Sequence, residues 1–148
     1  MKAKLILICA VVAISLCLSA CSPASKQVSL NFSWDDFKKE QHVRQEVEVP
    51  VDGSLIITLY SCPSEGRRWS EPAQIGDQTV LREVDHKYEP PPETIGCMPP
   101  PPGTPGQEVW TFKALEKGMS TISMEYTHPW EGGEKEPMLT FVLTVVVK

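Results

Sequence analysis

The 148-residue sequence lacks the clusters of reactive residues on which enzymes depend. Its three histidines, His42, His86 and His128, lie far apart, and none has a cysteine or carboxylate at metal-ligand spacing. It contains no nucleophile elbow, phosphate loop or helical zinc motif. Cys62 could be read as a nucleophile beside Glu65, but no histidine is close to it in sequence. These absences predict a protein that is not an enzyme and needs neither a metal nor another cofactor.

A basic run and a helical pattern are missing as well. Acidic residues outnumber basic ones by 19 to 14, so the chain lacks the electrostatic footprint of a nucleic-acid-binding protein. No segment has the apolar spacing of a helix, although residues 35–41 could form one short turn. Beyond residue 20 no apolar stretch is long enough to cross a membrane. We expect neither nucleic-acid binding nor a membrane-spanning domain.

The N-terminus has the pattern of an export signal. Lys2 and Lys4 precede an apolar segment, residues 5–18, that is too short for a comfortable membrane span. The sequence Leu-Ser-Ala-Cys that ends at Cys21 resembles a bacterial lipobox, in which the cysteine is lipidated and becomes N-terminal after cleavage. The alternative is an ordinary secretory signal with an unrelated cysteine. We expect an exported protein of the cell envelope, held on a membrane surface by a lipid at Cys21.

This interpretation divides the chain into three parts: a signal peptide (1–20), a lipidated tether (21–27) and one folded domain (28–148). Cleavage leaves 128 residues and changes the net charge from −5 to −7, because the signal holds two lysines and no acidic residue. A domain of some 120 residues buries roughly two-thirds of its unfolded surface, which suits a single core. We expect this domain to be a monomer.

Two cysteines remain in the exported part, Cys62 and Cys97. Outside the reducing cytosol such a pair is expected to form a disulfide. The bond would close a loop of about 36 residues, worth on the order of 3–4 kcal/mol in the chain-entropy model. The alternative is a pair of free thiols.

Alternation of apolar and polar residues runs along most of the chain and predicts strands. The expected strands cover residues 28–34, 47–51, 55–60, 79–88, 109–114, 122–126 and 139–147. The last is apolar on both faces, which predicts a central strand. Seven or eight strands with turn signals between them, and no internal repeat, predict an all-β sandwich.

Residues 90–105 hold eight of the fourteen prolines. Proline cannot donate to a sheet ladder, so this segment is expected to be an extended and fairly stiff connection. The alternative, a proline-rich ligand for a groove-type domain, is disfavoured outside the cell.

Three connections between strands hold the remaining informative residues, and they cover residues 61–69, 103–110 and 127–131. In a Greek-key sandwich alternate connections cluster at one end, so the three could form one surface. Trp69, Trp110 and Tyr126 border strands and are expected in the core, whereas Trp130 follows a proline in a polar loop and is expected to contact a partner. The glycines of these loops could serve simply as turn formers. Residues 131–136 are expected to form a solvated hairpin loop.

These loops resemble those of the chagasin-type inhibitors of papain-like cysteine proteases. The family pattern is a first loop Asn-Pro-Thr-Thr-Gly followed by an aromatic and a tryptophan, a second loop Gly-x-Gly-Gly, and a third loop Arg-Pro-Trp. The matching residues here are Pro63, Gly66, Trp69, Gly103, Gly106, Pro129 and Trp130. The resemblance spans roughly residues 43–148 and preserves the order and spacing of all three loops.

The resemblance implies an immunoglobulin-like β-sandwich of seven to eight strands that inhibits a papain-like cysteine protease reversibly. The first loop would wedge into the catalytic centre and the other two would flank it. The implied protease-binding residues are Pro63, Ser64, Glu65, Gly66, Gly103, Thr104, Pro105, Gly106, His128, Pro129 and Trp130. A disulfide between Cys62 and Cys97 would tie the first loop to the connection before the second.

The chain departs from the family pattern at several loop positions. Cys62 replaces the first-loop asparagine, and Ser64-Glu65 replaces the two threonines. Pro105 stands in place of a glycine, and His128 in place of the arginine. A carboxylate at position 65 must be paired or desolvated inside a cleft. The alternative function is therefore a non-inhibitory binding or structural module of the cell envelope with the same fold.

Overall fold

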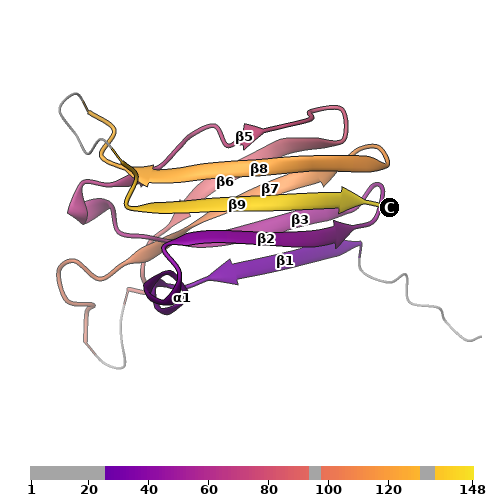
Figure 1. The fold of residues 1–148 in the computed structure, drawn as a ribbon. Helices are drawn as coiled ribbons and strands as arrows, with labels where there is room; N and C mark the ends of the chain where they lie inside the picture. The colour runs from indigo at the N-terminus through magenta and orange to yellow at the C-terminus, as the bar shows by residue number, and fades with distance from the viewer. Residues whose placement is uncertain (1–25, 94–97, 131–135) are drawn as a thin grey trace, which may run out of the picture.

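The computed structural model describes residues 26–93, 98–130 and 136–148. Two β-sheets packed face to face make up almost all of this part of the chain (Figure 1). The elements are β1 (Gln27–Phe32), α1 (Trp34–Lys39), β2 (His42–Val49), β3 (Ser54–Ser61), the 3₁₀ turn η1 (Pro63–Glu65), β4 (Arg68–Trp69), β5 (Gln74–Ile75), β6 (Leu81–Glu89), β7 (Gly106–Ala114), β8 (Gly118–Thr127) and β9 (Leu139–Val147). The expected signal peptide, Cys21, Cys97 and most of the 131–136 loop lie outside the described residues.

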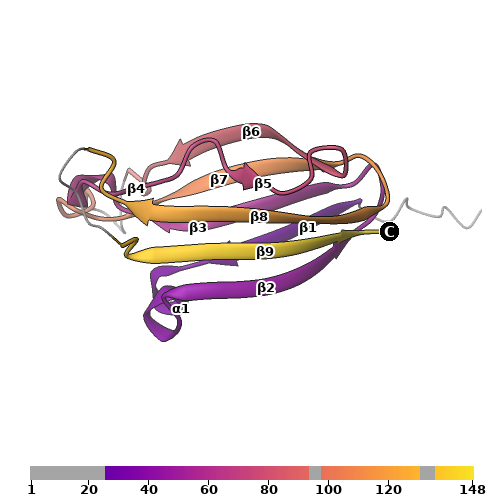
Figure 2. The ribbon, with the colours of Figure 1, turned by 45° about the horizontal axis from the view of Figure 1, so that its top comes forward.

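One sheet has the strand order β1-β3-β7-β6, and the other has the order β2-β9-β8-β4, with β5 also pairing with β8. The two layers are visible in Figure 2. β1 runs parallel to β3 and β2 parallel to β9, and the other pairs are antiparallel. The predicted all-β sandwich is confirmed. Nine strands are described instead of seven or eight, because β4 and β5 are two residues long and too short to show alternation.

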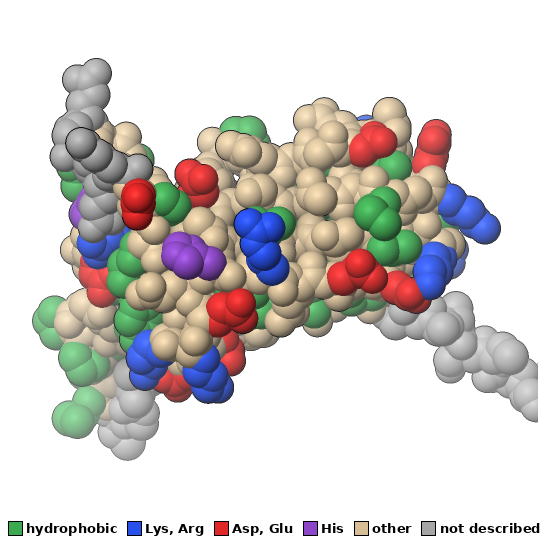
Figure 3. Space-filling view, viewed as in Figure 1, with side chains coloured by type: hydrophobic (Ala, Val, Ile, Leu, Met, Phe, Trp, Pro, Cys, Tyr) green, Lys and Arg blue, Asp and Glu red, His purple; other side chains and the backbone are tan. Residues whose placement is uncertain are grey.

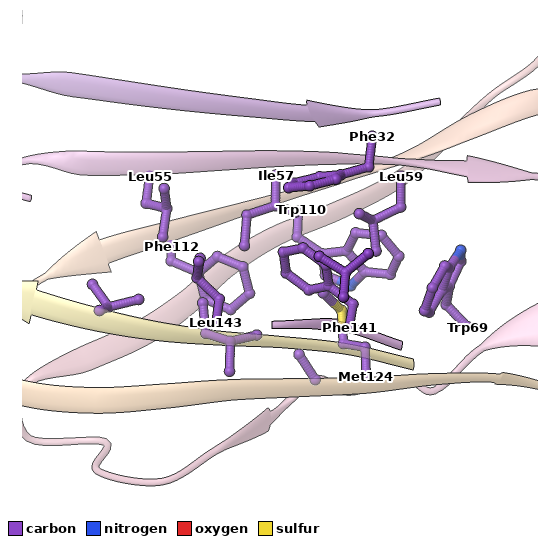
Figure 4. Close-up of a cluster of buried hydrophobic side chains, with 14 of the residues drawn as sticks. Phe32, Leu55, Ile57, Leu59, Trp69, Trp110, Phe112, Met124, Phe141 and Leu143 are labelled. Atoms are coloured by element: carbon purple, nitrogen blue, oxygen red, sulfur yellow. The ribbon is translucent and has the colours of Figure 1, made fainter. Parts of the chain in front are cut away.

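The core lies between the sheets, where every second residue of the long strands points inward. On β9 the burial pattern alternates strictly, and β9 lies between β2 and β8, so its predicted central position is confirmed. Trp69, Trp110 and Tyr126 are buried, as expected from the sequence. Figure 4 shows side chains of β3, β8 and β9 gathered around Trp110 and Phe112 of β7. Burial of each large apolar side chain contributes about 1.5–3 kcal/mol.

Helix α1 was expected only as a short turn. Its start is fixed by Asp36, whose Oδ2 accepts hydrogen bonds from the Ser33 backbone N–H (2.9 Å) and hydroxyl (2.7 Å). The buried ring of Phe37 packs against Trp69, with ring centroids 5.5 Å apart. A six-residue helix that buries a single side chain leaves no periodic apolar pattern, which is why the sequence did not predict it. No helix in the described residues is long enough to cross a membrane.

Strand register brings the three informative loops to one end of the sandwich. Ser61, the last residue of β3, pairs with Gly106, the first residue of β7, so the first and second loops emerge side by side. Thr127, the last residue of β8, pairs with Arg68, where the chain leaves the first loop. Figure 1 shows these connections at the left, far from the C-terminus. The predicted clustering of the loops at one end is therefore present in the fold.

Candidate binding surface of three loops

The candidate site consists of a first loop (residues 62–67), a second loop (residues 103–106) and a third loop (residues 128–130). The first and third loops touch directly, because Nδ1–H of His128 donates to the carbonyl oxygen of Gly66 at 3.1 Å. The first and second loops also touch, since the Cys62 thiol lies 3.5 Å from the carbonyl oxygen of Gly103. The structure thus brings all three sets of predicted residues together, with the first loop in contact with both others.

The first loop is a tight turn. The Glu65 N–H donates to Cys62 O (3.0 Å) and the Gly66 N–H donates to Pro63 O (2.9 Å), which closes η1. Gly66 then adopts φ of +78°, a left-handed conformation that favours glycine. A Cβ atom at this position would lie 2.6 Å from Cη2 of Trp130. Both the backbone and the third-loop indole therefore require glycine here, so Gly66 is more than a turn former.

The second loop is held from both sides. Pro101 O accepts from the backbone N–H (3.1 Å) and the hydroxyl (2.6 Å) of Thr104. Gly103 has φ of +83° and open space around its missing Cβ, so it fits the role of a turn former. Gly106 serves a different purpose, because a Cβ atom there would lie 2.4 Å from Glu89 O and 2.5 Å from the Tyr88 hydroxyl on β6. The two glycines of the expected pattern thus have separate physical reasons.

The third loop presents an aromatic side chain to solvent. Trp130 is 55% exposed, in contrast to the buried Trp69, Trp110 and Tyr126. Its ring centroid lies 4.6 Å from that of His128, and its edge lies over Gly66. The exposure expected for a contact residue is present, and the indole is restrained by two neighbours.

The first loop is anchored to three buried aromatic residues, Tyr60, Trp69 and Tyr126, which together are called the aromatic floor. The Cys62 backbone N–H donates to the hydroxyl of Tyr126 at 2.9 Å, and Nε1–H of Trp69 donates to Tyr60 O at 2.8 Å. The rings of Trp69 and Tyr126 lie 5.1 Å apart. Burial raises the pKa of Tyr126, and it also raises the pKa of Tyr60, so both phenols stay neutral and able to hydrogen-bond. This floor fixes where the first loop leaves the sandwich.

A polar network that the sequence did not suggest lies beside this floor. The buried Ser61 hydroxyl donates to Glu108 Oε1 at 2.7 Å, and His86 Nε2 is 2.9 Å from Glu108 Oε2. The other ring nitrogen of His86 lies 3.2 Å from Glu71, and its ring stacks on Trp110 with centroids 4.4 Å apart. The network therefore pairs the buried Glu108 and braces the end of β3 that carries the first loop.

His86, Glu108 and Glu71 also line a cavity of about 280 Å³ that reaches Pro63 of the first loop. Sequence reasoning missed this group because its members are far apart in the chain, and only the β6–β7 register places His86 opposite Trp110. One signal was present: a period of two puts Glu108 on the inward face with Trp110. Among the described residues no group of three His, Cys, Asp or Glu side chains is suited to a metal ion.

The departures from the loop pattern at Cys62, Glu65 and His128 have partners in the structure. Glu65 lies 3.9 Å from the guanidinium of Arg67, so its carboxylate is already paired in the free protein. His128 uses Nδ1 to hold the first loop. Cys62 is a buried free thiol, 3.2 Å from the Ser64 hydroxyl. Because Cys97 lies outside the described residues, the Cys62–Cys97 disulfide stays a prediction.

The comparison with known families decides the identity of this fold. A sequence model described as chagasin family peptidase inhibitor I42 matches residues 48–145. The chain belongs to the chagasin family. The match contains all three loops, and β1 and α1 precede it. Because chagasin-family members are peptidase inhibitors, the prediction that the protein is not an enzyme is confirmed.

Solved structures agree on the chagasin fold. The crystal structure of the cysteine protease inhibitor EhICP2 from Entamoeba histolytica has a TM-score of 0.59 and 21% identity, and the match covers 82% of this chain and 95% of that one. PbICP-C, solved in complex with falcipain-2, has a TM-score of 0.50 and 17% identity, with coverage of 83% and 99%. No curated protein matches the chain. The structural likeness supports the chagasin-type sandwich.

Proposed function

We propose that this chagasin-family protein is a reversible inhibitor of papain-like cysteine proteases and docks its three loops on the active-site cleft. The observation that carries the proposal is the mutual contact of the loops at one end, where Gly66 meets both His128 and Trp130. Two similar structures support the partner class: one is of a cysteine protease inhibitor, and the other is of an inhibitor bound to falcipain-2.

The proposed mechanism involves no chemical reaction. It depends on the shape of the loops and on the surface that they bury. The first loop, a closed turn with Pro63 at its start, enters the catalytic centre, and the second and third loops contact the two walls of the cleft. Loops fixed by a rigid sandwich lose little conformational entropy on binding. Trp130 provides a large and partly immobilised aromatic anchor of the kind that dominates small interfaces. The Glu65–Arg67 pair reduces the cost of bringing the carboxylate to the cleft.

We also propose that Cys21 carries a lipid and that the protein is presented from a membrane surface of the cell envelope. The support is the lipobox-like sequence, together with the position of Lys26 relative to the loops. Lys26 O accepts from the Ser54 N–H at 2.7 Å, at the start of β3, whereas the first loop follows the end of the same strand. A tether before Lys26 therefore leaves the loops free. The mass of the N-terminal peptide of the mature protein tests lipidation.

The experiment that tests inhibition is a titration of soluble protein, residues 22–148, against papain and a cathepsin-L-type enzyme. We expect loss of activity at nanomolar to micromolar protein, reversed on dilution. The change Trp130→Ala should raise the inhibition constant at least tenfold, given hot-spot losses of about 2 kcal/mol or more. Val84→Ala is the matched control, since Val84 is another exposed apolar residue (52%), on β6.

The outcomes separate the two functions. Folded protein that leaves both enzymes active at tens of micromolar would contradict the proposal and favour a non-inhibitory module with the same fold. Inhibition that is equal for Trp130→Ala and Val84→Ala would remove the anchor role from Trp130.

A further inference from the structure

We infer that residues 98–102 form a fourth contact element, an apolar lip that packs against an apolar surface on the rim of the protease cleft. The inference rests on the proposed function and extends it, because these residues precede the second loop and have no counterpart in the three-loop pattern. The lip has the sequence Met-Pro-Pro-Pro-Pro and continues directly into Gly103.

The composition of the lip sets the chemistry of its partner. Met98 is 70% exposed, the highest value among the exposed large hydrophobic side chains of the described chain. Pro99, Pro101 and Pro102 are exposed as well, and Pro100 is partly buried. No charged residue occurs from position 98 to 106, although 22% of the chain is charged. A surface of proline rings and one thioether is complemented by apolar side chains and has no side-chain charge to pair with a charged partner.

The lip is ordered for contact before any partner arrives. Each proline fixes its own φ near −65°, which limits the conformations that binding must remove. Pro101 O accepts two hydrogen bonds from Thr104, and Gly103 turns the chain with its positive φ. The Cys62 sulfur lies 3.5 Å from Gly103 O, which places the end of the lip against the first loop. The unbranched Met98 side chain supplies the adaptable part of this otherwise stiff surface.

The position of the lip makes it continuous with the proposed interface. Apolar side chains protrude at the lower left of the molecule in Figure 3, at the end where residues 98–102 lie in Figure 1. The first loop contacts Gly103 on one hand and Trp130 on the other. A protease that receives the first loop in its cleft therefore meets the lip with the adjoining rim. Proteases with an apolar rim should be inhibited more tightly than those with a charged rim.

The test compares substitutions of two methionines that are similarly exposed but lie in different parts of the sandwich. Met98→Ser removes the lip's thioether, and Met119→Ser changes a similarly exposed methionine (62%) at the start of β8, which pairs with the end of β9 away from the loops. Inhibition constants are measured for wild type, both variants and Trp130→Ala against several papain-like proteases. We expect Met98→Ser to weaken inhibition about tenfold for the most tightly inhibited protease, the loss expected for burial of part of a methionine side chain. Met119→Ser should match wild type.

The controls distinguish failure of the lip proposal from failure of the proposed inhibitor function. Equal inhibition by the two methionine variants, while Trp130→Ala is impaired, would overturn the lip and leave the inhibitor function intact. A wild-type protein that inhibits no papain-like protease would overturn both. Thermal unfolding of both variants should match wild type, because each side chain is exposed.

Discussion

At Gly66 both the backbone conformation and the contact between loops require glycine. Its φ of +78° costs an L-residue about 1–2 kcal/mol, and its Cβ position is occupied by the Trp130 ring. Gly103 has nearly the same φ but open space around it. Comparing substitutions at Gly66 and Gly103 therefore separates the cost of backbone strain from the cost of displacing the Trp130 indole.

We predict that Gly103→Ala lowers the free energy of unfolding by about 1–2 kcal/mol and leaves the third loop in place. Gly66→Ala should lower it by more and should also raise the inhibition constant at least tenfold, because Trp130 must move. Urea unfolding and protease titration of the two variants check this. An inhibition constant of Gly66→Ala equal to that of wild type would show that the Gly66–Trp130 contact is unimportant.

At the level of single residues, the sequence predicted which residues would lie together, but it did not predict the contacts between them. Pro63, Gly66, Gly103 and Trp130 were chosen because of the family pattern, and their contacts follow from strand register. The hydrogen bond from His128 to Gly66 could not be predicted, since the residues are 62 positions apart and either could have faced solvent. The Ser61–Glu108–His86 network was missed for the same reason.

Among the elements, α1 depends on a local electrostatic cap. Hydrogen bonds from the Ser33 hydroxyl and N–H hold the pKa of Asp36 below its ordinary value of 3.8. A lowered pKa in the folded state means that the charged carboxylate stabilises the fold above its unfolded pKa. This contribution is lost as the pH falls through the folded pKa.

We predict that Asp36→Asn unfolds at a lower temperature than wild type at neutral pH, and that the difference is constant above about pH 5. The difference should shrink as the pH falls below 3.8, because wild type then loses the same charge. Thermal unfolding followed by circular dichroism across this range is the measurement. A difference that persists unchanged at the lowest pH would assign the effect to something other than the carboxylate charge.

The long strands could be predicted because alternation is a local signal, and the short elements could not. Residues 139–147 alternate in burial over their whole length, as their sequence indicates. β4 and β5 are strands only because β8 offers them partners, and β2 extends back to His42 because β9 pairs with it throughout. The parallel pairing of β1 with β3 joins segments whose order along the sheet has no sequence signal.

Across the whole molecule, the start of β1 and the binding surface lie at opposite ends of the sandwich. Gln27 pairs with Ser54 at the start of β3, and the first loop leaves the other end of this eight-residue strand, roughly 25 Å away at the usual rise per residue. A lipid at Cys21 would therefore leave the loops pointing away from the membrane. This arrangement suits a partner that arrives from the surrounding compartment.

The central claim is that the three-loop end occupies a protease cleft, and binding to an open and a filled cleft tests it most directly. Soluble protein is titrated against a papain-like protease that it inhibits, once with the cleft free and once with a peptide-sized covalent reagent bound to the catalytic cysteine. The account predicts that filling the cleft weakens binding at least a hundredfold, or about 2.7 kcal/mol. Equal affinity for both forms would contradict it and would place the contact outside the cleft.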